Sequence, residues 1–372
     1  MKSNHKLTTL ITCIVLLSLA VAQASSDRTK LGDTRSVALP PFAILDDDAQ
    51  PAMTASGKVG FVSSITAGSL IAFSVSTGRV LSSIVVGENA GPVSLVEASG
   101  RRLAAVPAAN NPSEGHPATI TIVDVTSTQS LEIKSLLVLP VEAQITQTTR
   151  ALLTEDGKFC LIATSIGEPA LFVFDVESGE LLSRMSLLER SGEVALHEDG
   201  DNRLIAVVSA LANTLSVISL EGRGNLNLVS MFSPQDARFG EANNPAFNSD
   251  GRSIYIAASE GDRLYAIDSR SGAQFGSLAV SAPHRVNVSR TADGADLIGV
   301  TRIRRPANGR PGGATVVAYR GGRLTMKAEF TPPADIEFTK ANNLVFDRTG
   351  DVAFIGSDSG TLFAFNTSTG EL

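Results

Sequence analysis

The chain has 372 residues, of which 43% are hydrophobic, 19% charged and 5% aromatic, and its formal net charge at pH 7 is −7. This composition excludes an intrinsically disordered chain, and the acidic balance argues against nucleic acid as a partner. Two cysteines in the whole sequence exclude a disulfide-rich scaffold, so one large all-β domain or two average domains remain.

The first 24 residues have the pattern of a secretory signal peptide. A short basic start precedes an apolar run over 7–22, and Ala22-Gln23-Ala24 is a small-x-small cleavage site. A retained membrane anchor is the alternative, but the run is shorter than the roughly 20 residues that a spanning helix needs. We therefore expect cleavage after Ala24, a secreted or periplasmic location, and no membrane span in the mature chain.

From residue 50 to residue 372, short apolar strands alternate with turns rich in Gly, Asp, Asn and Ser. One unit consists of four strands, with a glycine turn after the first strand and another after the third, and it is clearest over 151–187. These glycines are Gly57, Gly100, Gly157, Gly200, Gly251, Gly294 and Gly350 in the first turn, and Gly78, Gly179, Gly222, Gly272, Gly322 and Gly370 in the second. Seven units of roughly 50 residues predict an all-β fold, a seven-bladed β-propeller with four-stranded antiparallel blades.

The last unit ends two residues after Gly370, so it has no residues left for an outermost strand of its own. Residues 25–49 form an N-terminal segment before the repeats, with a strand-like stretch over 35–40. An unfilled place would leave an unpaired edge, which favours aggregation. We therefore expect residues 35–40 to complete the last blade, so that an N-terminal strand closes the ring.

Two segments resemble the repeats of YVTN-type propellers. Pro283-His284-Arg285-Val286-Asn287-Val288-Ser289, followed by Asp293-Gly294, is similar to their Pro-His entry, and residues 362–370 are similar to their third strand and Thr-Gly turn. Asp175 and Asp268 stand where such repeats often carry Asp. The resemblance covers roughly residues 50–372 and implies the propeller fold. It leaves the function open, because the superfamily includes lactonases, cofactor-binding subunits and many uncharacterised secreted proteins.

Nearly all of the variation in connection length falls on one face of the predicted ring, opposite the short glycine turns. Such an asymmetry favours a binding face, although neutral drift in loop length is the alternative. The candidate ligand-binding residues on this face are Asn243, Asn244, Asn342 and Asn343 at the channel rim, His284 and Arg285 at the entry to the sixth unit, and Arg302, Arg304 and Arg305 in the loop after it. Asn amides bind cations or sugar hydroxyls but are also common at strand entries. The arginines suit a carboxylate or phosphate, but also a solvated loop.

Motifs for metal binding and for nucleophilic catalysis are absent from the sequence. His116, His197 and His284 have no His or Cys partner at metal-ligand spacing, so we expect neither a zinc site nor a cofactor. Cys160 lies in an apolar, strand-like run with no base nearby, and we expect it to be a buried, inert thiol.

These observations favour a monomeric, non-catalytic binding module that takes a protein, a glycan or a small anionic ligand on its long-loop face. The alternative is a lactonase-like hydrolase with its site at the channel mouth. His284, Arg285 and the arginines over 302–310 would then supply the acid-base and anion-holding groups. A third hypothesis, a partner subunit of a redox enzyme, is weakened because a chain without Trp lacks the Trp docking motif of quinoprotein propellers.

Overall fold

The computed structural model describes residues 51–98, 100–109, 116–240, 243–291, 293–303, 311–333, 336, 338, 343–347, 349–357 and 362–372. The expected signal peptide and closing strand over 35–40 lie outside the described residues, as do Arg304, Arg305 and Asn342. In the described ranges every regular element is a strand, and none of them holds a helix with the length and hydropathy of a membrane span.

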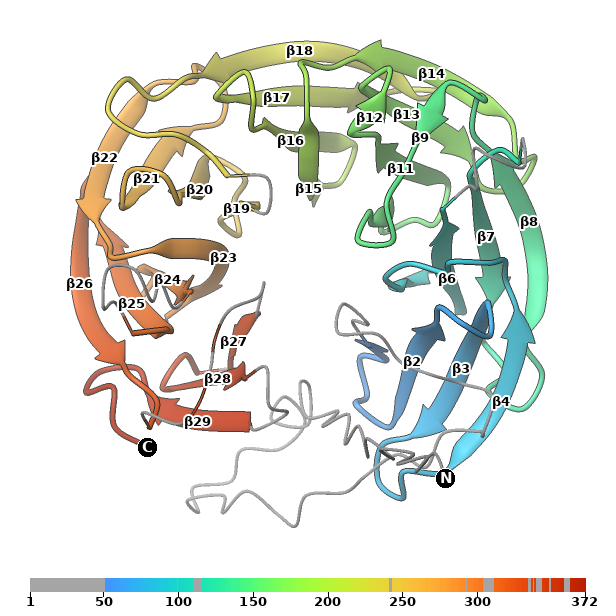
Figure 1. Cartoon of the computed structure of the whole chain (residues 1–372), viewed down its shortest axis with the longest axis horizontal. Coiled ribbons are helices and arrows are strands. Elements are labelled where there is room, and N and C mark those ends of the chain that lie inside the picture. Colours follow the sequence, from blue (N-terminus) through green and yellow to red (C-terminus); the bar gives the residue numbers. More distant parts are fainter. Residues whose placement is uncertain are drawn as a thin grey trace, which may run out of the picture.

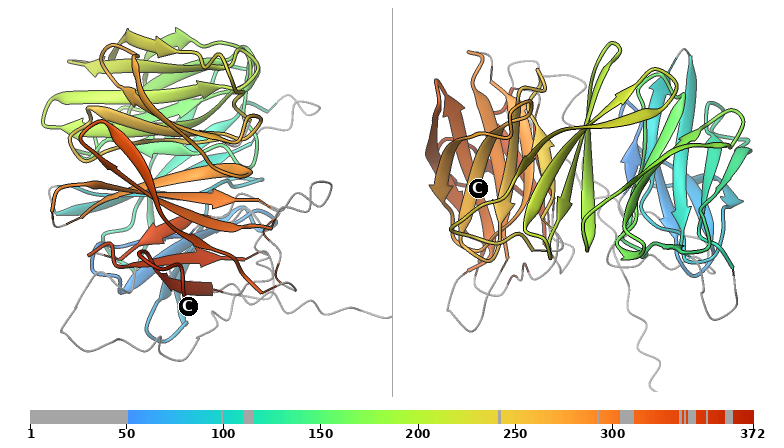
Figure 2. Two further views of the ribbon diagram at one scale, coloured as in Figure 1. Left: turned by 90° about the vertical axis from the view of Figure 1, so that its left-hand side faces the viewer. Right: turned by 90° about the horizontal axis from the view of Figure 1, so that it is seen from above.

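Seven antiparallel sheets, the blades, stand in a ring around a central axis (Figure 1). Each blade is a meander whose strands follow chain order, and its first strand lies nearest the axis. The side views show the blades packed face to face, with their connections at the two ends of the strands (Figure 2). The predicted seven-bladed propeller is therefore confirmed.

The strands of the first four blades are β1 (Ala52–Met53), β2 (Val59–Ser64), β3 (Ser69–Ser74) and β4 (Val80–Val85); β5 (Ser94–Ala98), β6 (Arg101–Ala108), β7 (Thr119–Asp124) and β8 (Glu132–Val138); β10 (Ala151–Leu153), β11 (Phe159–Ala163), β13 (Ala170–Asp175) and β14 (Leu181–Ser186); and β15 (Ser191–Asp199), β16 (Asn202–Ser209), β17 (Thr214–Glu221) and β18 (Asn225–Phe232). Those of the last three are β19 (Pro245–Phe247), β20 (Ser253–Ala258), β21 (Arg263–Asp268) and β22 (Gln274–Ala279); β23 (Pro283–Arg290), β24 (Asp296–Arg302), β25 (Gly313–Arg320) and β26 (Arg323–Phe330); and β27 (Leu344–Phe346), β28 (Val352–Gly356) and β29 (Leu362–Asn366). In the described residues the seventh blade thus has three strands, with β29 outermost.

The repeat glycines are confirmed as turn residues. All of them have positive φ, for example 69° at Gly157 and 77° at Gly179. A side chain at such a φ is strained, whereas glycine adopts it without steric cost. The Gly157 amide donates to the Thr154 carbonyl at 2.8 Å and closes the turn between the first two strands of its blade.

The hydrophobic core lies between neighbouring blades. Between the second and third blades, for example, Ile120 and Leu137 pack in one cluster with Phe172, Phe174 and Cys160. Cys160 is a free thiol with no exposed area, as the sequence predicted. Burial raises the pKa of this thiol above its ordinary value, so it stays protonated and unreactive at neutral pH.

Neighbouring blades are also joined at their outer strands. In the first six blades the fourth strand carries one extra residue opposite the third strand, a β-bulge. In the first four blades the next residue is a serine whose hydroxyl donates to a carbonyl in the turn between the third and fourth strands of the following blade. These outer serine bonds are Ser82 to Thr128 (2.7 Å), Ser135 to Val176 (2.7 Å), Ser183 to Gly224, and Ser230 to Ser269 (2.7 Å). The fifth and sixth blades have Gly276 and Ala328 at this place.

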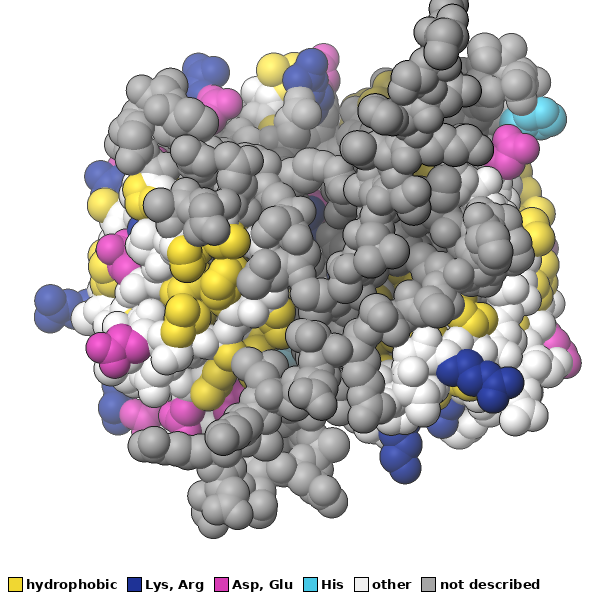
Figure 3. Space-filling model, turned by 60° about the horizontal axis from the view of Figure 1, so that its bottom comes forward, with side chains coloured by type: hydrophobic (Ala, Val, Ile, Leu, Met, Phe, Trp, Pro, Cys, Tyr) yellow, Lys and Arg dark blue, Asp and Glu magenta, His cyan; other side chains and the backbone are white. Residues whose placement is uncertain are grey.

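The outer surface of the ring mixes charged and apolar side chains. On the side that carries the first and last blades, acidic and basic side chains are interspersed with exposed hydrophobic ones (Figure 3). Exposed apolar side chains also occur on outer strands of the second to fourth blades, such as Leu136 on β8 and Leu228 on β18.

Candidate functional site

The connections at the two ends of the blades differ as the sequence predicted. One end carries short turns, such as residues 154–158 between β10 and β11. The other end, the long-loop face, carries connections such as residues 233–244 between β18 and β19. A two-stranded sheet of β9 (Ala143–Gln144) and β12 (Ile166–Gly167) joins two of these long connections beside the third blade. This part of the long-loop face therefore has a hydrogen-bonded structure of its own.

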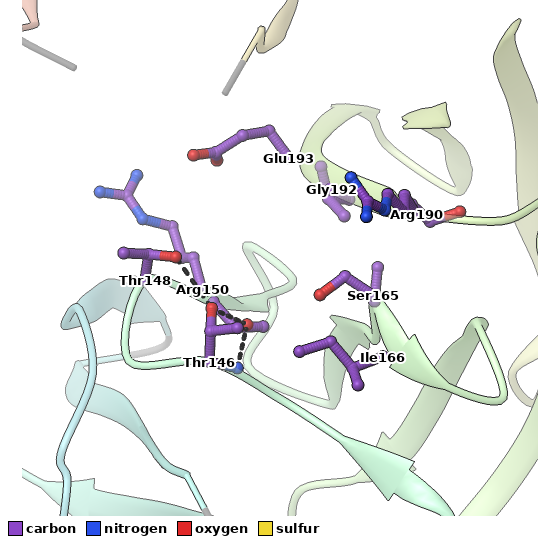
Figure 4. Close-up of a pocket in the computed structure, with 12 residues that line it drawn as sticks. Thr146, Thr148, Arg150, Ser165, Ile166, Arg190, Gly192 and Glu193 are labelled. Carbon is purple, nitrogen blue, oxygen red and sulfur yellow. Dashed lines mark hydrogen bonds between the residues drawn. The ribbon is translucent and has the colours of Figure 1, made fainter. Parts of the chain in front are cut away.

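A pocket of 580 Å³ opens on the long-loop face between the third and fourth blades (Figure 4). Its walls come from the connection before β10, the connection between β11 and β13, and the start of β15. The lining residues are Thr146, Thr148, Thr149, Arg150, Ala163, Ser165, Ile166, Arg190, Ser191, Gly192, Glu193 and Val194. Its volume lies in the range of small-molecule sites, about 300–1,000 Å³.

The connection before β10 is shaped by its own threonines. The Thr149 amide donates to the Thr146 carbonyl at 3.0 Å, and the Thr146 amide donates to the Thr149 hydroxyl at 2.9 Å. Such side-chain bonds to nearby backbone stabilise turns. Arg150 follows this turn directly and immediately precedes β10, the innermost strand of its blade.

An ion pair links two innermost strands that are not neighbours. Arg285 Nη2, from β23 of the sixth blade, donates to Glu193 Oε1, from β15 of the fourth blade, at 2.6 Å. The two side chains are only 11% and 20% exposed. Arg285 Nη1 also lies 3.5 Å from Asn343 Oδ1, at the start of the seventh blade. Arg285 therefore reaches towards both the fourth and the seventh blades at the end of the axis on the long-loop face, which we call the channel mouth.

Arg150 belongs to the same electrostatic group. Burial lowers the pKa of Arg150, the Glu193 charge raises it, and the Arg285 charge lowers it further. Figure 4 shows the Arg150 and Glu193 side chains extending towards the same side of the pocket. We call Arg150, Glu193 and Arg285 the mouth cluster. The cluster joins two guanidiniums and one carboxylate, and their charges interact more strongly than in water because water is partly excluded from them.

The amides of Asn243 and Asn244 are engaged in joining the fifth and sixth blades. Asn244 Oδ1 accepts from the Val286 amide and Asn244 Nδ2 donates to the Val286 carbonyl, both at 2.8 Å. Asn243 Nδ2 donates to the His284 carbonyl at 2.8 Å, and its Oδ1 accepts from the Ser259 amide at 3.3 Å. The side chains of these two candidates thus form hydrogen bonds with the backbone of β23, which is the structural alternative to ligand binding for Asn at a strand entry.

Arg302 differs from its expected place in a loop, because it is the last residue of β24. Its side chain is 5% exposed, and its Nη2 donates to the Phe330 carbonyl at 2.8 Å while Nη1 donates to Glu329 Oε1 at 3.2 Å. The residue paired with it on β25 is Gly313, which has no side chain to block the guanidinium from crossing towards β26. Arg302 therefore points towards the outer strand of its own blade. Burial lowers its pKa.

Of the sequence candidates, the structure brings Arg285 and Asn343 together at the channel mouth, with His284 directly beside Arg285. Arg150, Arg190 and Glu193 were not singled out. Arg150 immediately precedes an innermost strand, as Asn244 does, so the rule that selected the Asn pairs would have found it in the third unit. Within the described residues, no three His, Cys, Asp or Glu side chains lie close enough together to hold a metal ion.

No family model and no curated protein matches the chain. Solved structures do. A functionally unknown protein from Desulfotomaculum acetoxidans is 16% identical with a TM-score of 0.62, over 84% of this chain and 93% of that one. A chain of the mitotic checkpoint complex is 13% identical with a TM-score of 0.61, over 93% and 95%. The C-terminal WD40 domain of Sif2 is 10% identical with a TM-score of 0.54, over 83% and 78%. At these identities the likeness shows the propeller fold alone.

Proposed function

We propose that the protein is a secreted or periplasmic binding module of the YVTN-repeat type that takes its ligand at the channel mouth and the adjoining pocket. The mouth cluster is the observation that carries this proposal. Three connections form one pocket, and an arginine from a distant blade contacts the Glu193 that lines it. A rigid scaffold often presents a binding site on its loops in this way. The signal-peptide pattern supports the secreted or periplasmic location. One structural neighbour is a chain of a multi-protein complex, which agrees with a role in binding.

A pocket-filling variant tests the site. Ser165 lines the pocket and is half-buried, so Ser165→Phe places a ring in the space that a ligand would occupy. Ser76→Phe, in an exposed turn on the opposite face, is the matched control. Thermal-shift screening of glycans, peptides and small anions should find a ligand whose binding is lost in Ser165→Phe and kept in Ser76→Phe. A ligand that binds both variants equally would place the binding surface elsewhere.

The compartment is tested separately. Expression of the whole chain in a secreting host, followed by mass spectrometry of the exported protein, should give a mature N-terminus at Ser25. An intact N-terminus retained in the cytoplasm would refute it.

A lactonase-like hydrolase is the alternative function, and one observation favours it. The Glu193 carboxylate lies beside guanidiniums at the channel mouth, an arrangement that can hold a carbonyl compound and move a proton. Steady hydrolysis of a lactone panel, assayed with and without divalent metal and abolished in Ser165→Phe, would replace the binding function with this one.

A further inference from the structure

We propose that the pocket between the third and fourth blades binds a primary carboxamide, such as the side-chain amide of glutamine, through the backbone N–H and C=O of Val194. The molecule itself supplies the template, because an asparagine side chain forms this contact at the equivalent place two blades further on. This inference rests on the proposed binding function and names its ligand class.

The entries to the third and fifth blades have the same structure. The Thr149 hydroxyl accepts a hydrogen bond from the amide three positions earlier at 2.9 Å, and Asn243 Oδ1 accepts one from the amide three positions before it. Both residues also donate their own amides to the carbonyl three positions back, at 3.0 and 3.1 Å. The residue that follows is Arg150 in one blade and Asn244 in the other, and each directly precedes an innermost strand. Arg150 and Asn244 are therefore equivalent.

The entries to the fourth and sixth blades are equivalent in the same way. Arg190 and Ala282 precede the innermost strands with positive φ of 51° and 46°. The carbonyl of each accepts from the amide that follows the second strand of its blade, at 3.1 and 3.2 Å. Four residues further on, after an irregular stretch, the regular pairing with that second strand resumes at Val194 and at Val286. Val194 is therefore the counterpart of Val286.

Between the fifth and sixth blades, a carboxamide joins these two positions. Asn244 Oδ1 accepts from the Val286 amide and Asn244 Nδ2 donates to the Val286 carbonyl, both at 2.8 Å. The two bonds use one edge of a primary amide, where the oxygen and one N–H point to the same side. The contact satisfies backbone groups on the free edge of an innermost strand, where no further strand of the blade pairs with them.

Val194 offers the same two groups at the pocket, which it lines. Asp199 and Asn202 close a two-residue hairpin, and hydrogen-bonded and non-hydrogen-bonded pairs alternate back from it along β15. By this count Val194 and Val207 form a non-hydrogen-bonded pair, so the N–H and C=O of Val194 point away from β16. Within the described ranges, no side chain forms a hydrogen bond with either group.

Arg150 cannot take the role of Asn244. A guanidinium has five donors and no acceptor, so it cannot receive the Val194 N–H. The Arg150 side chain extends instead towards Glu193, whose charge favours the protonated guanidinium (Figure 4). The place that the Asn244 carboxamide fills in the later blades is therefore left to the pocket, and a ligand carboxamide can enter there.

The geometry of the two bonds selects a primary carboxamide. A carboxylate has only acceptors and provides no donor for the Val194 carbonyl. In a trans secondary amide, such as a peptide bond, a carbon substituent stands beside the oxygen in place of the N–H, so only one of the two bonds can form. The pocket volume of 580 Å³ leaves room for the rest of a ligand that is larger than its amide group.

Calorimetry and amide hydrogen exchange with L-glutamine test the contact. Glutamine should bind the unaltered protein and, at saturation, slow the exchange of the Val194 amide, because this N–H gains an acceptor. The Val286 amide, which Asn244 already accepts, should exchange equally with and without glutamine and is the internal control. L-Glutamate and 5-N-ethyl-L-glutamine lack the N–H beside the oxygen and should bind at least about tenfold more weakly.

Arg150→Asn copies the internal template into the third blade. The new carboxamide should protect the Val194 amide without ligand and weaken glutamine binding at least about tenfold, because it occupies the place of the ligand. Arg320→Asn is the matched control, since it makes the same change at an exposed arginine on the opposite face. It should bind glutamine as the unaltered protein does. If Arg150→Asn does not fold, exchange at Val194 in the unaltered protein decides alone.

A peptide distinguishes the two sources of a carboxamide. Acetyl-Ala-Gln-Ala presents the same group on an extended chain. Tighter binding of this peptide than of glutamine would identify a protein side chain as the source, and weaker binding would identify a small free amide.

The proposal is overturned if glutamate or the ethylated amide binds as tightly as glutamine, or if the exchange of the Val194 amide is unaffected by glutamine. It is also overturned if neither glutamine nor the peptide binds. The proposed binding function stands in these cases if another ligand binds and is lost in Ser165→Phe. If no ligand of any class is sensitive to Ser165→Phe, both proposals fail.

Discussion

The Arg285 guanidinium holds the Glu193 carboxylate across 92 positions of sequence, and the whole fifth blade lies between their strands. Both residues lie near the start of an innermost strand. These starts meet at the channel mouth because the chain enters each blade from the long-loop face. The contact is therefore a product of the closed ring and not of any local motif. It also makes the charge at the mouth depend on the relative position of two blades that do not touch along their sheets.

The backbone conformation of Arg190 should have a measurable cost in stability. It lines the pocket with φ of 51°, a left-handed conformation that costs a non-glycine residue about 1–2 kcal/mol. Arg190→Gly and Arg190→Ala both remove the guanidinium, but only glycine relieves the backbone. We expect Arg190→Gly to be more stable than Arg190→Ala by about 1 kcal/mol in urea denaturation, on the scale of that cost. Equal stability of the two variants would show that the backbone at Arg190 is not strained.

The outer serine bonds should contribute measurably to the joins between blades. Ser135→Ala removes the bond to the Val176 carbonyl and should lower the free energy of unfolding by about 1 kcal/mol. The reverse change is Ala328→Ser, which places a hydroxyl where the sixth blade lacks one, opposite the Thr367 turn. This serine should raise the free energy of unfolding by up to about 1 kcal/mol.

Urea denaturation measures both changes, and Ser76→Ala, at an exposed turn serine, is the control. Destabilisation by Ala328→Ser would mean that the new hydroxyl is buried without reaching an acceptor, because an unpaired buried hydroxyl is costly.

The aspartates at the second turn of the repeats should make stability depend on pH. Asp268 Oδ1 accepts from the Ser271 hydroxyl and amide, both at 2.7 Å, and these bonds lower the pKa of Asp268. A carboxylate whose pKa is lower in the folded state stabilises the fold above its unfolded pKa of about 3.9. This contribution is lost as the pH falls through the folded pKa.

Between pH 6 and pH 3 the unaltered protein should therefore lose more stability than Asp268→Asn, which carries no titrating group at this position. The two should converge at the acidic end in urea denaturation. Parallel stability curves over this range would exclude Asp268 as the titrating group.

The closure of the ring by residues 35–40 stays a prediction, since that segment lies outside the described residues. β29 is the outermost described strand of the seventh blade, whereas every other blade has a fourth strand. Deleting residues 25–42 from the mature protein should lower the melting temperature markedly or cause aggregation, as an unpaired edge strand favours association. A truncated protein that remains monomeric with an unchanged melting temperature would show that the ring closes in another way.

The fold could be predicted because its signal is local. Each repeat glycine, such as Gly157 or Gly179, reports a backbone conformation that only a tight turn between strands requires. The periodic recurrence of these turns then gives the number of blades. The buried state of Cys160 followed in the same way from its apolar neighbours along the strand.

The candidate site was predicted only in part, because it depends on which blades face one another. The rim position of Arg285 could be read from the repeat, but its partner Glu193 could not, since no spacing relates residues from the fourth and sixth blades. Asn244 lies at a strand entry, as predicted. Its side chain binds the backbone of the next blade, a role that polar side chains at strand entries often have. The prediction that Arg302 lies in a loop was wrong. The space for its buried side chain comes from Gly313 on the neighbouring strand, and this pairing cannot be recognised from the sequence around Arg302.

The bulges in the fourth strands also affect how this protein behaves at high concentration. A blade's outer strand offers unpaired backbone groups to any extended chain, and a propeller exposes such an edge on each blade. Here the first six blades interrupt that edge with an extra residue, such as Lys134 on β8 or Lys327 on β26. An incoming strand can pair on one side of the extra residue but not continue past it. Pairing between two rings along any of these six edges is therefore interrupted at the bulge, even where Leu136 and Leu228 expose apolar surface.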